Sequence, residues 1–359
     1  MIILSKNLKN AHILVIGSGI IGKFNAAELS KLNCKVSISD PSPENNGSTS
    51  SLGILMGRIY RKRSGRAWEL RQKSLELWPI WIKTLQEFNP KIQIDKPLIQ
   101  LTSNAKVFEK MAKFAVNRER EGIEILDKKS TIIKNIDHIF PDNKFKGIVS
   151  YEDGRINPIA LLKTLDKYLD QQNIHKFKNK IIKISKLDNK WIALCKGGEE
   201  IVADAILVCN SLNTLKIIDS WEYQIKLKPV LGQAIELSFE DKLINFLSLP
   251  KVLSLNGKNF IPIEKNKIII GSTSEEDISP REEYINELLS LFDQKPFWMK
   301  KKYISRQWYG IRSRPENQAS PILKSLARGL LLCSGFYKNG ILLAPACSHW
   351  VKNEIKKHL

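Results

Sequence analysis

Cysteine and histidine are scarce in this 359-residue chain, which contains five of each. No two cysteines form a CxxC pair, and the histidines show no spacing typical of metal ligands. The sequence therefore predicts neither a disulfide framework nor a metal site, and the unpaired cysteines favour a reducing, cytoplasmic location. Long apolar runs are also missing. The most apolar segments, 203–208 and 329–336, are far shorter than the ~20 residues that cross a bilayer, and 1–4 is too short for a signal-peptide core.

Acidic residues are outnumbered, since 57 lysines and arginines face 37 aspartates and glutamates, giving a net charge of +20. Such an excess can indicate a nucleic-acid or membrane-surface partner. The lysines are dispersed from Lys6 to Lys357, however, and the only dense basic run is 58–66. We therefore interpret the charge as compositional and expect no nucleic-acid partner. A hydrophobic content of 43% excludes a disordered chain, and the length predicts about two domains.

The clearest motif lies near the N-terminus. An apolar run at 12–16, suited to a strand buried on both faces, leads directly into Gly17-Ser-Gly-Ile-Ile-Gly22. A helical stretch and a second strand that ends at Asp40 follow. Gly17 permits a tight turn, Gly19 lets a pyrophosphate approach the backbone, and Gly22 allows the helix to pack closely on the strand. With Asp40 able to bind a ribose, this pattern predicts a dinucleotide site at a helix N-terminus.

A second glycine-rich loop lies near the C-terminus. The apolar segment 329–334 leads into Gly335-Phe-Tyr-Lys-Asn-Gly340, and a helix is predicted for 342–357. A further buried strand at 205–209 is followed by Asn210. Three such loops at strand ends indicate one sheet that meets one large cofactor.

These segments resemble the FAD-dependent D-amino acid oxidase superfamily, in particular glycine oxidase and monomeric sarcosine oxidase, over about residues 11–356. The most specific pieces are 17–22 with Asp40, 49–51, Gly310-Ile-Arg312 and the run Asn339-Gly-Ile-Leu-Leu-Ala-Pro345. The segment Arg58-Ile-Tyr-Arg61 is closer to sarcosine oxidase.

The resemblance implies an α/β fold in which a Rossmann-like FAD-binding domain is interleaved with an α+β substrate domain built on an antiparallel sheet. The FAD-binding domain would comprise 11–89, 151–226 and 306–359, and the substrate domain 90–150 and 227–305.

The resemblance also implies how the cofactor is held. FAD would be bound non-covalently, because no cysteine or histidine stands where relatives attach the flavin. The backbone of Ile181 would meet the adenine, 49–51 would follow the phosphates and ribityl chain, and the helix starting near Gly340 would place positive charge at the flavin pyrimidine ring. The expected cofactor-binding residues are Gly17, Ser18, Gly19, Ile20, Ile21, Gly22, Asp40, Thr49, Ser50, Ser51, Ile181, Asn210, Gly335, Tyr337, Asn339, Gly340 and Ile341.

The activity implied by the resemblance is oxidation of a small amine or amino acid, of the glycine, D-amino acid or N-methyl amino acid type. Hydride would pass from the substrate α-carbon to flavin N5, with O2 or a quinone-linked carrier as the electron acceptor. This reaction needs no strong protein acid or base, in agreement with the missing histidine or cysteine constellation.

The substrate carboxylate needs an anchor, and arginine suits it because its planar fork binds carboxylate through two hydrogen bonds. Similarity to glycine oxidase favours Arg312, and similarity to sarcosine oxidase favours Arg61 with Lys338. Alternatively, Arg312 forms a salt bridge under the sheet and Arg61 belongs to a solvated charged run. Phe260 stands where glycine oxidase has a carboxylate-binding tyrosine, and a phenylalanine also replaces a frequent family histidine in the C-terminal loop.

Two other functions remain open from the sequence. A relative of this superfamily removes a carboxymethyl group from a carboxymethylaminomethyl wobble uridine of tRNA, and a basic chain would suit such a polyanion. The chain could also be a flavin- or NAD-binding module without turnover.

Overall fold

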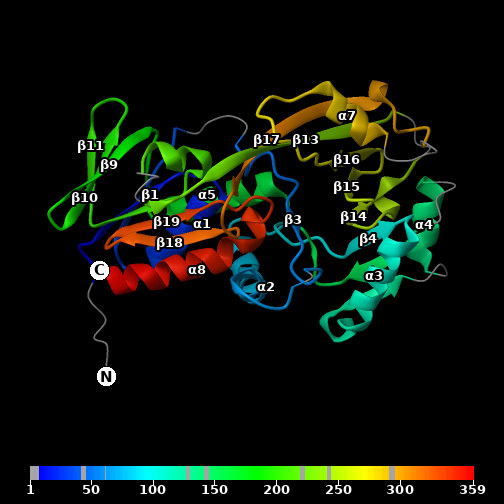
Figure 1. Ribbon diagram of the computed structural model, residues 1–359, viewed down its shortest axis with the longest axis horizontal. Coiled ribbons are helices and arrows are strands. Elements are labelled where there is room, and N and C mark those ends of the chain that lie inside the picture. The colour runs from blue at the N-terminus through cyan, green and yellow to red at the C-terminus, as the bar shows by residue number, and fades with distance from the viewer. Residues whose placement is uncertain are drawn as a thin grey trace.

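A computed structural model describes residues 8–41, 46–60, 62–126, 130–140, 145–218, 223–240, 244–290 and 296–359. These residues form two large β-sheets next to one another, with helices packed against both (Figure 1). The combination of a parallel and an antiparallel sheet confirms the predicted α/β architecture. Within the described ranges, no helix is both long and apolar enough to span a bilayer.

The first sheet is mainly parallel. Its order is β18-β19-β12-β1-β2-β8, and each neighbouring pair is parallel except β18 with β19. The strands are β1 (His12–Ile16), β2 (Lys35–Ser39), β8 (His175–Phe177), β12 (Ala205–Val208), β18 (Ile322–Ala327) and β19 (Leu330–Ser334). β1 and β2 have the bounds that the apolar patterns predicted, so the βαβ unit is confirmed.

Both faces of the first sheet are buried, because successive side chains of a strand point to opposite sides. Ile13 and Val15 of β1 pack among the helices, whereas Leu14 and Ile16 pack against a three-stranded antiparallel sheet at one end of the molecule (Figure 1). The helices are α1 (Ile20–Leu29), α2 (Arg66–Gln86), α5 (Pro158–Gln171) and α8 (Gly340–His358). The three strands are β9 (Ile181–Leu187), β10 (Lys190–Cys195) and β11 (Glu200–Ala203).

The second sheet is antiparallel except for one pair, β14 with β4, and its order is β17-β13-β16-β15-β14-β4-β6-β5. That parallel pair joins two separate parts of the chain, 98–150 and 227–315, into one sheet. The strands are β4 (Leu98–Thr102), β5 (Ile123–Leu126), β6 (Lys146–Ser150), β13 (Leu227–Ser238), β14 (Val252–Leu255), β15 (Lys258–Glu264), β16 (Lys267–Gly271) and β17 (Ile304–Pro315).

The two faces of the second sheet have different neighbours. One face packs on α4 (Thr131–Ile139) and α7 (Glu282–Leu289), and Phe260 of β15 is fully buried in that core. Near one edge the other face packs on α3 (Ala105–Val116). Since side chains alternate along a strand, Asn259 and Ile261 lie on the face opposite to Phe260. Ile261 accordingly belongs to a separate apolar cluster with Leu52.

The remaining elements are short. A two-stranded ribbon consists of β3 (Ile54–Leu55) and β7 (Gly154–Arg155). Short 3-10 helices are η1 (Ser30–Leu32), η2 (Glu119–Glu121), η3 (Ser211–Lys216), η4 (Phe246–Ser248) and η5 (Lys301–Tyr303).

Several elements differ from the sequence predictions. The sequence predicts a helix at 24–32 after the glycine motif, but the observed helix α1 begins at Ile20, because Gly19 is its N-cap. The sequence also predicts a strand at 303–308, but the observed strand β17 extends to Pro315, because it pairs with β13 along almost its whole length. α4 is absent from the predictions, although Ile133 and Ile136 repeat at helical spacing.

The strand pairing of the two sheets indicates where one domain ends and the other begins. We propose that the chain forms two discontinuous domains close to the predicted ones, with one change. β17 crosses the predicted limit at 306 and pairs with β13, so residues up to 315 go with the second sheet.

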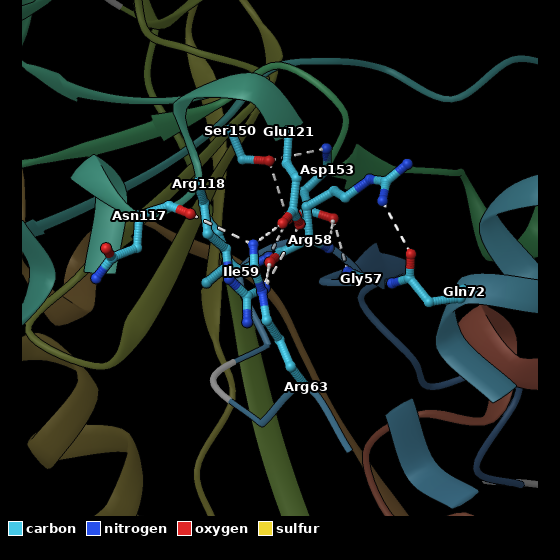
Figure 2. Close-up of polar contacts among 10 residues, drawn as sticks. All are labelled: Gly57, Arg58, Ile59, Arg63, Gln72, Asn117, Arg118, Glu121, Ser150 and Asp153. Atoms are coloured by element: carbon cyan, nitrogen blue, oxygen red, sulfur yellow. Dashed lines mark hydrogen bonds and ion pairs between the residues drawn. The ribbon is translucent and has the colours of Figure 1, made fainter. Parts of the chain in front are cut away.

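A buried carboxylate, which follows β6, holds the segment 57–59 that leads from β3 toward α2 (Figure 2). Asp153 is fully buried, and its Oδ1 accepts hydrogen bonds from the backbone N–H groups of Gly57 (2.6 Å) and Arg58 (2.9 Å). Its Oδ2 accepts from Ile59 N–H (2.8 Å) and the Ser150 hydroxyl (3.0 Å). Burial raises the pKa of Asp153, and the four donors act in the opposite direction.

Arginines surround this carboxylate in Figure 2. Arg118 is buried and donates to the carbonyl oxygen of Arg58 at 2.7 Å, and Arg63 forms an ion pair with Glu121. The Arg58 guanidinium donates in turn to Oε1 of Gln72 on α2 at 2.9 Å. The segment is thus held by both its backbone and its side chains.

Replacement of Gly22 by alanine should strongly destabilise the first sheet. The new Cβ would overlap the carbonyl oxygen of Gly17, which is rigid backbone. We expect the free energy of unfolding to fall by about 3 kcal/mol or more in urea titrations followed by circular dichroism. Unchanged stability would contradict this close packing.

Asp153→Asn should also destabilise the fold, because an amide cannot accept from all the donors that the carboxylate satisfies. Each backbone N–H left without an acceptor costs about 1–3 kcal/mol. Ser150→Ala is the control, since it removes one neutral hydrogen bond, worth about 1 kcal/mol. Equal midpoints for the two variants in urea unfolding would argue against this role of Asp153.

Candidate active site

One large cavity lies where the two sheets meet. The loops after β1, β2, β12 and β19 line it from the first sheet, because the carboxyl ends of parallel strands meet at one edge. Residues of β4, β13, β15 and β17 line it from the second sheet. Its volume is about 1350 Å³, larger than the ~300–1,000 Å³ of a typical small-molecule pocket. The cavity is large enough for an extended cofactor together with a substrate.

The three glycines of the N-terminal motif have different structural roles. Gly17 has a φ of +107°, and a Cβ there would lie 2.7 Å from the carbonyl oxygen of Cys209. Gly22 packs against Gly17 and does not line the cavity. Gly19 lines the cavity with a φ of -70°, and a Cβ there would meet only the Ser48 hydroxyl, at 3.0 Å. Gly19 thus leaves free space on the cavity side, which is what a bound pyrophosphate needs.

Polar groups surround the N-terminus of α1. The Asp40 carboxylate accepts a hydrogen bond from the backbone N–H of Ser18, and both residues line the cavity. The Ser48 hydroxyl accepts from the N–H of Ile20 at 2.9 Å. Ser48 is not among the predicted cofactor residues, although the hydroxyl-rich run that continues to Ser51 points to it.

The C-terminal loop brings a second helix N-terminus to the cavity. Tyr337 has a φ of +53°, and its N–H donates to the carbonyl oxygen of Ser313 on β17 at 3.0 Å. Asn339, Gly340 and Ile341 then line the cavity, and the Asn339 side chain does not cap α8. The positive end of the helix dipole is therefore available to a ligand with anionic character.

The predicted FAD fits this arrangement. All predicted cofactor-binding residues except Gly22 line the one cavity, from Ser18 and Asp40 at one wall to Ile341 at another. Two helix N-termini present positive dipole ends to the cavity, and the carboxylate of Asp40 lines it, where it would be able to accept a hydrogen bond from a ribose. Among the described residues, no group of three or more histidine, cysteine, aspartate or glutamate side chains could hold a metal ion.

Arg312 lies on β17 and reaches into the cavity from the second sheet. Its Nη2 donates to the Ser272 hydroxyl at 2.7 Å, and its Nη1 donates to the carbonyl oxygens of Leu231 and Thr273, both at 3.3 Å. Gly232 makes room for it, because a Cβ there would overlap the guanidinium. In the described part of the chain, no carboxylate lies within 4.0 Å of this cation, so the predicted alternative of a salt bridge under the sheet has no partner there.

A buried acid lies behind Arg312. Glu275 is 1% exposed and accepts hydrogen bonds from the Gln233 amide, at 3.1 and 3.3 Å, and from the Thr273 hydroxyl. Burial lowers the pKa of Arg312, whereas Tyr337 and Glu275 raise it. Glu275 thus favours the charged guanidinium without occupying its donors.

The other predicted anchors differ from Arg312. Lys338 lies exposed at the cavity wall, with its Nζ 5.2 Å from the ring centroid of Tyr337. Arg61 lies outside the described residues.

Tyr337 is affected by the cations around it. Burial raises the pKa of Tyr337, but the Ser274 hydroxyl and the cations Lys338 and Arg314 outweigh the effect of burial, so the net shift of the pKa is downward.

Further cavity residues are missing from the sequence predictions. On the second sheet Asn259 and Gln100 line the cavity, whereas Phe260, the residue singled out from the sequence, points into the opposite core. Tyr60 and Arg71 line it from the segment around α2. The alternation of β15 could have indicated Asn259, but nothing local distinguishes Arg71 from other helical arginines.

Comparison with known proteins agrees with this site. The chain matches the family described as FAD dependent oxidoreductase (DAO) over residues 12–353. No protein among the curated sequences matches it significantly.

Solved structures share the fold at low sequence identity. Glycine oxidase from Bacillus cereus ATCC 14579 superposes with a TM-score of 0.82 at 19% identity, covering 98% of this chain and 96% of that one. Iminodiacetate oxidase from Chelativorans sp. BNC1 gives 0.82 at 16% identity, covering 97% and 96%. L-alpha-glycerophosphate oxidase from Mycoplasma pneumoniae with FAD bound gives 0.80 at 14% identity, covering 96% and 94%.

The predicted resemblance is therefore confirmed: the chain belongs to the family of FAD-dependent oxidoreductases (DAO) and is an FAD-dependent enzyme.

Proposed function

We propose that this enzyme oxidises a small amine or amino acid, of the glycine, D-amino acid or N-methyl amino acid type, and that Arg312 binds the substrate carboxylate. The observation that carries the proposal is the guanidinium of Arg312, which lines the cavity and has no described carboxylate within 4.0 Å. Three fixed acceptors hold one side of it. A substrate carboxylate would complete its hydrogen bonds in the geometry that arginine favours.

FAD, when bound, supplies the chemistry by accepting a hydride from the substrate α-carbon. The residues of this chain then have two tasks. Arg312 binds the substrate carboxylate and so limits the orientations that the α-carbon can take in the cavity. Part of the binding free energy is thereby used to hold the α-carbon in the orientation in which it reacts. The first turn of α8, at Asn339 and Gly340, presents a positive dipole end to the cavity and favours negative charge there.

The solved neighbours support the substrate class without choosing a substrate. Two of them are named for glycine and for iminodiacetate, which are amines that carry carboxylates. In this chain Asn259 lines the cavity, and the neighbouring Phe260 is buried in the core on the opposite face of the sheet. Neither residue has the hydroxyl of the carboxylate-binding tyrosine with which Phe260 was compared.

The direct test is anaerobic reduction of the bound flavin. The purified protein is mixed with glycine, sarcosine, proline, D-amino acids, iminodiacetate and tRNA bearing carboxymethylaminomethyl uridine, and the absorbance of oxidised flavin is followed. Bleaching by a small amine or amino acid supports the proposal. Bleaching by the tRNA alone, or by none of these compounds, would overturn it. Reoxidation by O2 or by a quinone then identifies the electron acceptor.

Arg312→Met should raise KM for the substrate by about 100-fold, because hydrogen bonds between charged groups contribute ~1.5–3 kcal/mol each. The bound flavin should stay, since Arg312 reaches the cavity from the second sheet. Lys338→Met is the matched control, which removes an equal charge at an exposed position of the cavity wall. A large KM effect of Lys338→Met, with none of Arg312→Met, would transfer the anchor to the alternative site.

Gly19→Ala should weaken FAD binding by at least tenfold with little change in the stability of the apoprotein. The added Cβ lies on the cavity side and meets only the Ser48 hydroxyl. Ultrafiltration of released flavin gives the dissociation constant, and urea unfolding of the apoprotein gives the stability. Acid precipitation should release all the flavin from the native protein if it is bound non-covalently. Unchanged FAD affinity would exclude Gly19 from the pyrophosphate site.

A further inference from the structure

A second arginine of the cavity has no anionic partner among the described residues. Arg71 on α2 is only 5% exposed and lines the same cavity as Arg312. Its Nη1 donates at 2.9 Å to the carbonyl oxygen of Ala67, one turn earlier in its own helix. Its Nε is buried and has no hydrogen-bond partner. Among the described residues no carboxylate lies within 4.0 Å of its guanidinium.

Arg71 differs in this respect from another buried arginine of the chain. Arg118 is 3% exposed, donates to the carbonyl oxygen of Arg58 at 2.7 Å and lies 3.8 Å from the Glu121 carboxylate. A buried charge without a counter-charge costs free energy, and burial lowers the pKa of Arg71. An anion in the cavity would supply the missing partner.

The guanidinium of Arg71 is held in place. The Tyr60 ring lies against it, with 3.7 Å between the ring centroid and Cζ. Tyr60 directly follows the segment 57–59, which Asp153 fixes and which Arg58 ties to Gln72, the next residue of α2 after Arg71 (Figure 2). The cation is therefore pre-organised, which reduces the entropy lost when an anion binds.

A second buried polar atom without a hydrogen-bond partner among the described residues lies in the part of the cavity wall that the second sheet forms. Oδ1 of Asn259 is buried and has no partner, and Asn259 lines the cavity. Asn259 pairs across the sheet with Gly271, which directly precedes the Ser272 that binds Arg312. The cavity wall thus contains two arginines without a described carboxylate within 4.0 Å and an amide oxygen that can accept a hydrogen bond from a substrate N–H.

We propose that Arg71 binds a second carboxylate of the substrate, so that the substrate is an amine with two carboxylates. One carboxylate lies on Arg312, the other on Arg71, and Asn259 accepts a hydrogen bond from the amine. This inference rests on the proposed function and narrows it from small amines to dicarboxylic ones.

The test compares two ligands that differ by one carboxylate and carry no amine to be oxidised. Thiodiacetate has two carboxylates, and (methylthio)acetate has one. Their dissociation constants are measured by calorimetry and by the change in the flavin spectrum of the holoenzyme. The wild type should bind thiodiacetate at least 30-fold more tightly. Arg71→Gln should abolish this preference and leave (methylthio)acetate binding within twofold of the wild type, whereas Arg71→Lys should retain part of the preference.

Other outcomes separate the two proposals. Arg312→Met should weaken both ligands, and if it weakens neither, the proposed anchor fails. If (methylthio)acetate binds through Arg312 but the wild type shows no preference for thiodiacetate, only the role of Arg71 fails. If Arg71→Gln lowers the flavin reduction potential and changes the affinity of both ligands equally, Arg71 faces the flavin, and the inference is overturned.

Discussion

The close approach of α1 to the end of β1 is the constraint on which the rest of the structure depends. Gly22 packs against the carbonyl oxygen of Gly17, and Gly17 itself has a positive φ next to Cys209. This compact turn leaves the N-terminus of α1 open to the cavity, with Asp40 beside it on the neighbouring strand. Every other part of the site is arranged against this wall, because the parallel strands end at the same edge.

Two arginines line the cavity without a carboxylate of the described chain within 4.0 Å. Arg312 is held by carbonyl and hydroxyl oxygens, and Arg71 by its own helix and an aromatic ring. Glu275, a buried acid whose charge raises the pKa of Arg312, has its oxygens engaged by Gln233 and Thr273. Glu275 favours the charged form of Arg312 against the effect of burial, and it leaves the guanidinium donors available to an anionic ligand.

Much of the net charge of +20 has no such role. Exposed lysines pair with nearby acids, as Lys73 does with Glu76 and Lys357 with Glu354. Pairs of this kind on the surface contribute little to stability. Arg71 and Arg312 are different, because Arg71 is buried, Arg312 is half-buried, and both line the cavity with no described carboxylate within 4.0 Å.

The sequence by itself determined the local units. The apolar run of β1, the glycines of both loops, and the Asn157-Pro158 start of α5 are recognisable because each depends on residues adjacent in the chain. The resemblance to the family added the cofactor residues that are distant in sequence, and all the predicted ones except Gly22 line one cavity.

Only the tertiary structure decided the substrate side of the cavity. Asn259 rather than Phe260 lines it because Phe260 packs into the core on the opposite face of β15, and Arg71 of α2 lies against Tyr60, which follows the segment that Asp153 holds. These contacts join parts of the chain that are distant in sequence, and the parallel pairing of β4 with β14 is one of them. No local pattern encodes such pairings, because their free energy arises only when the separate segments meet.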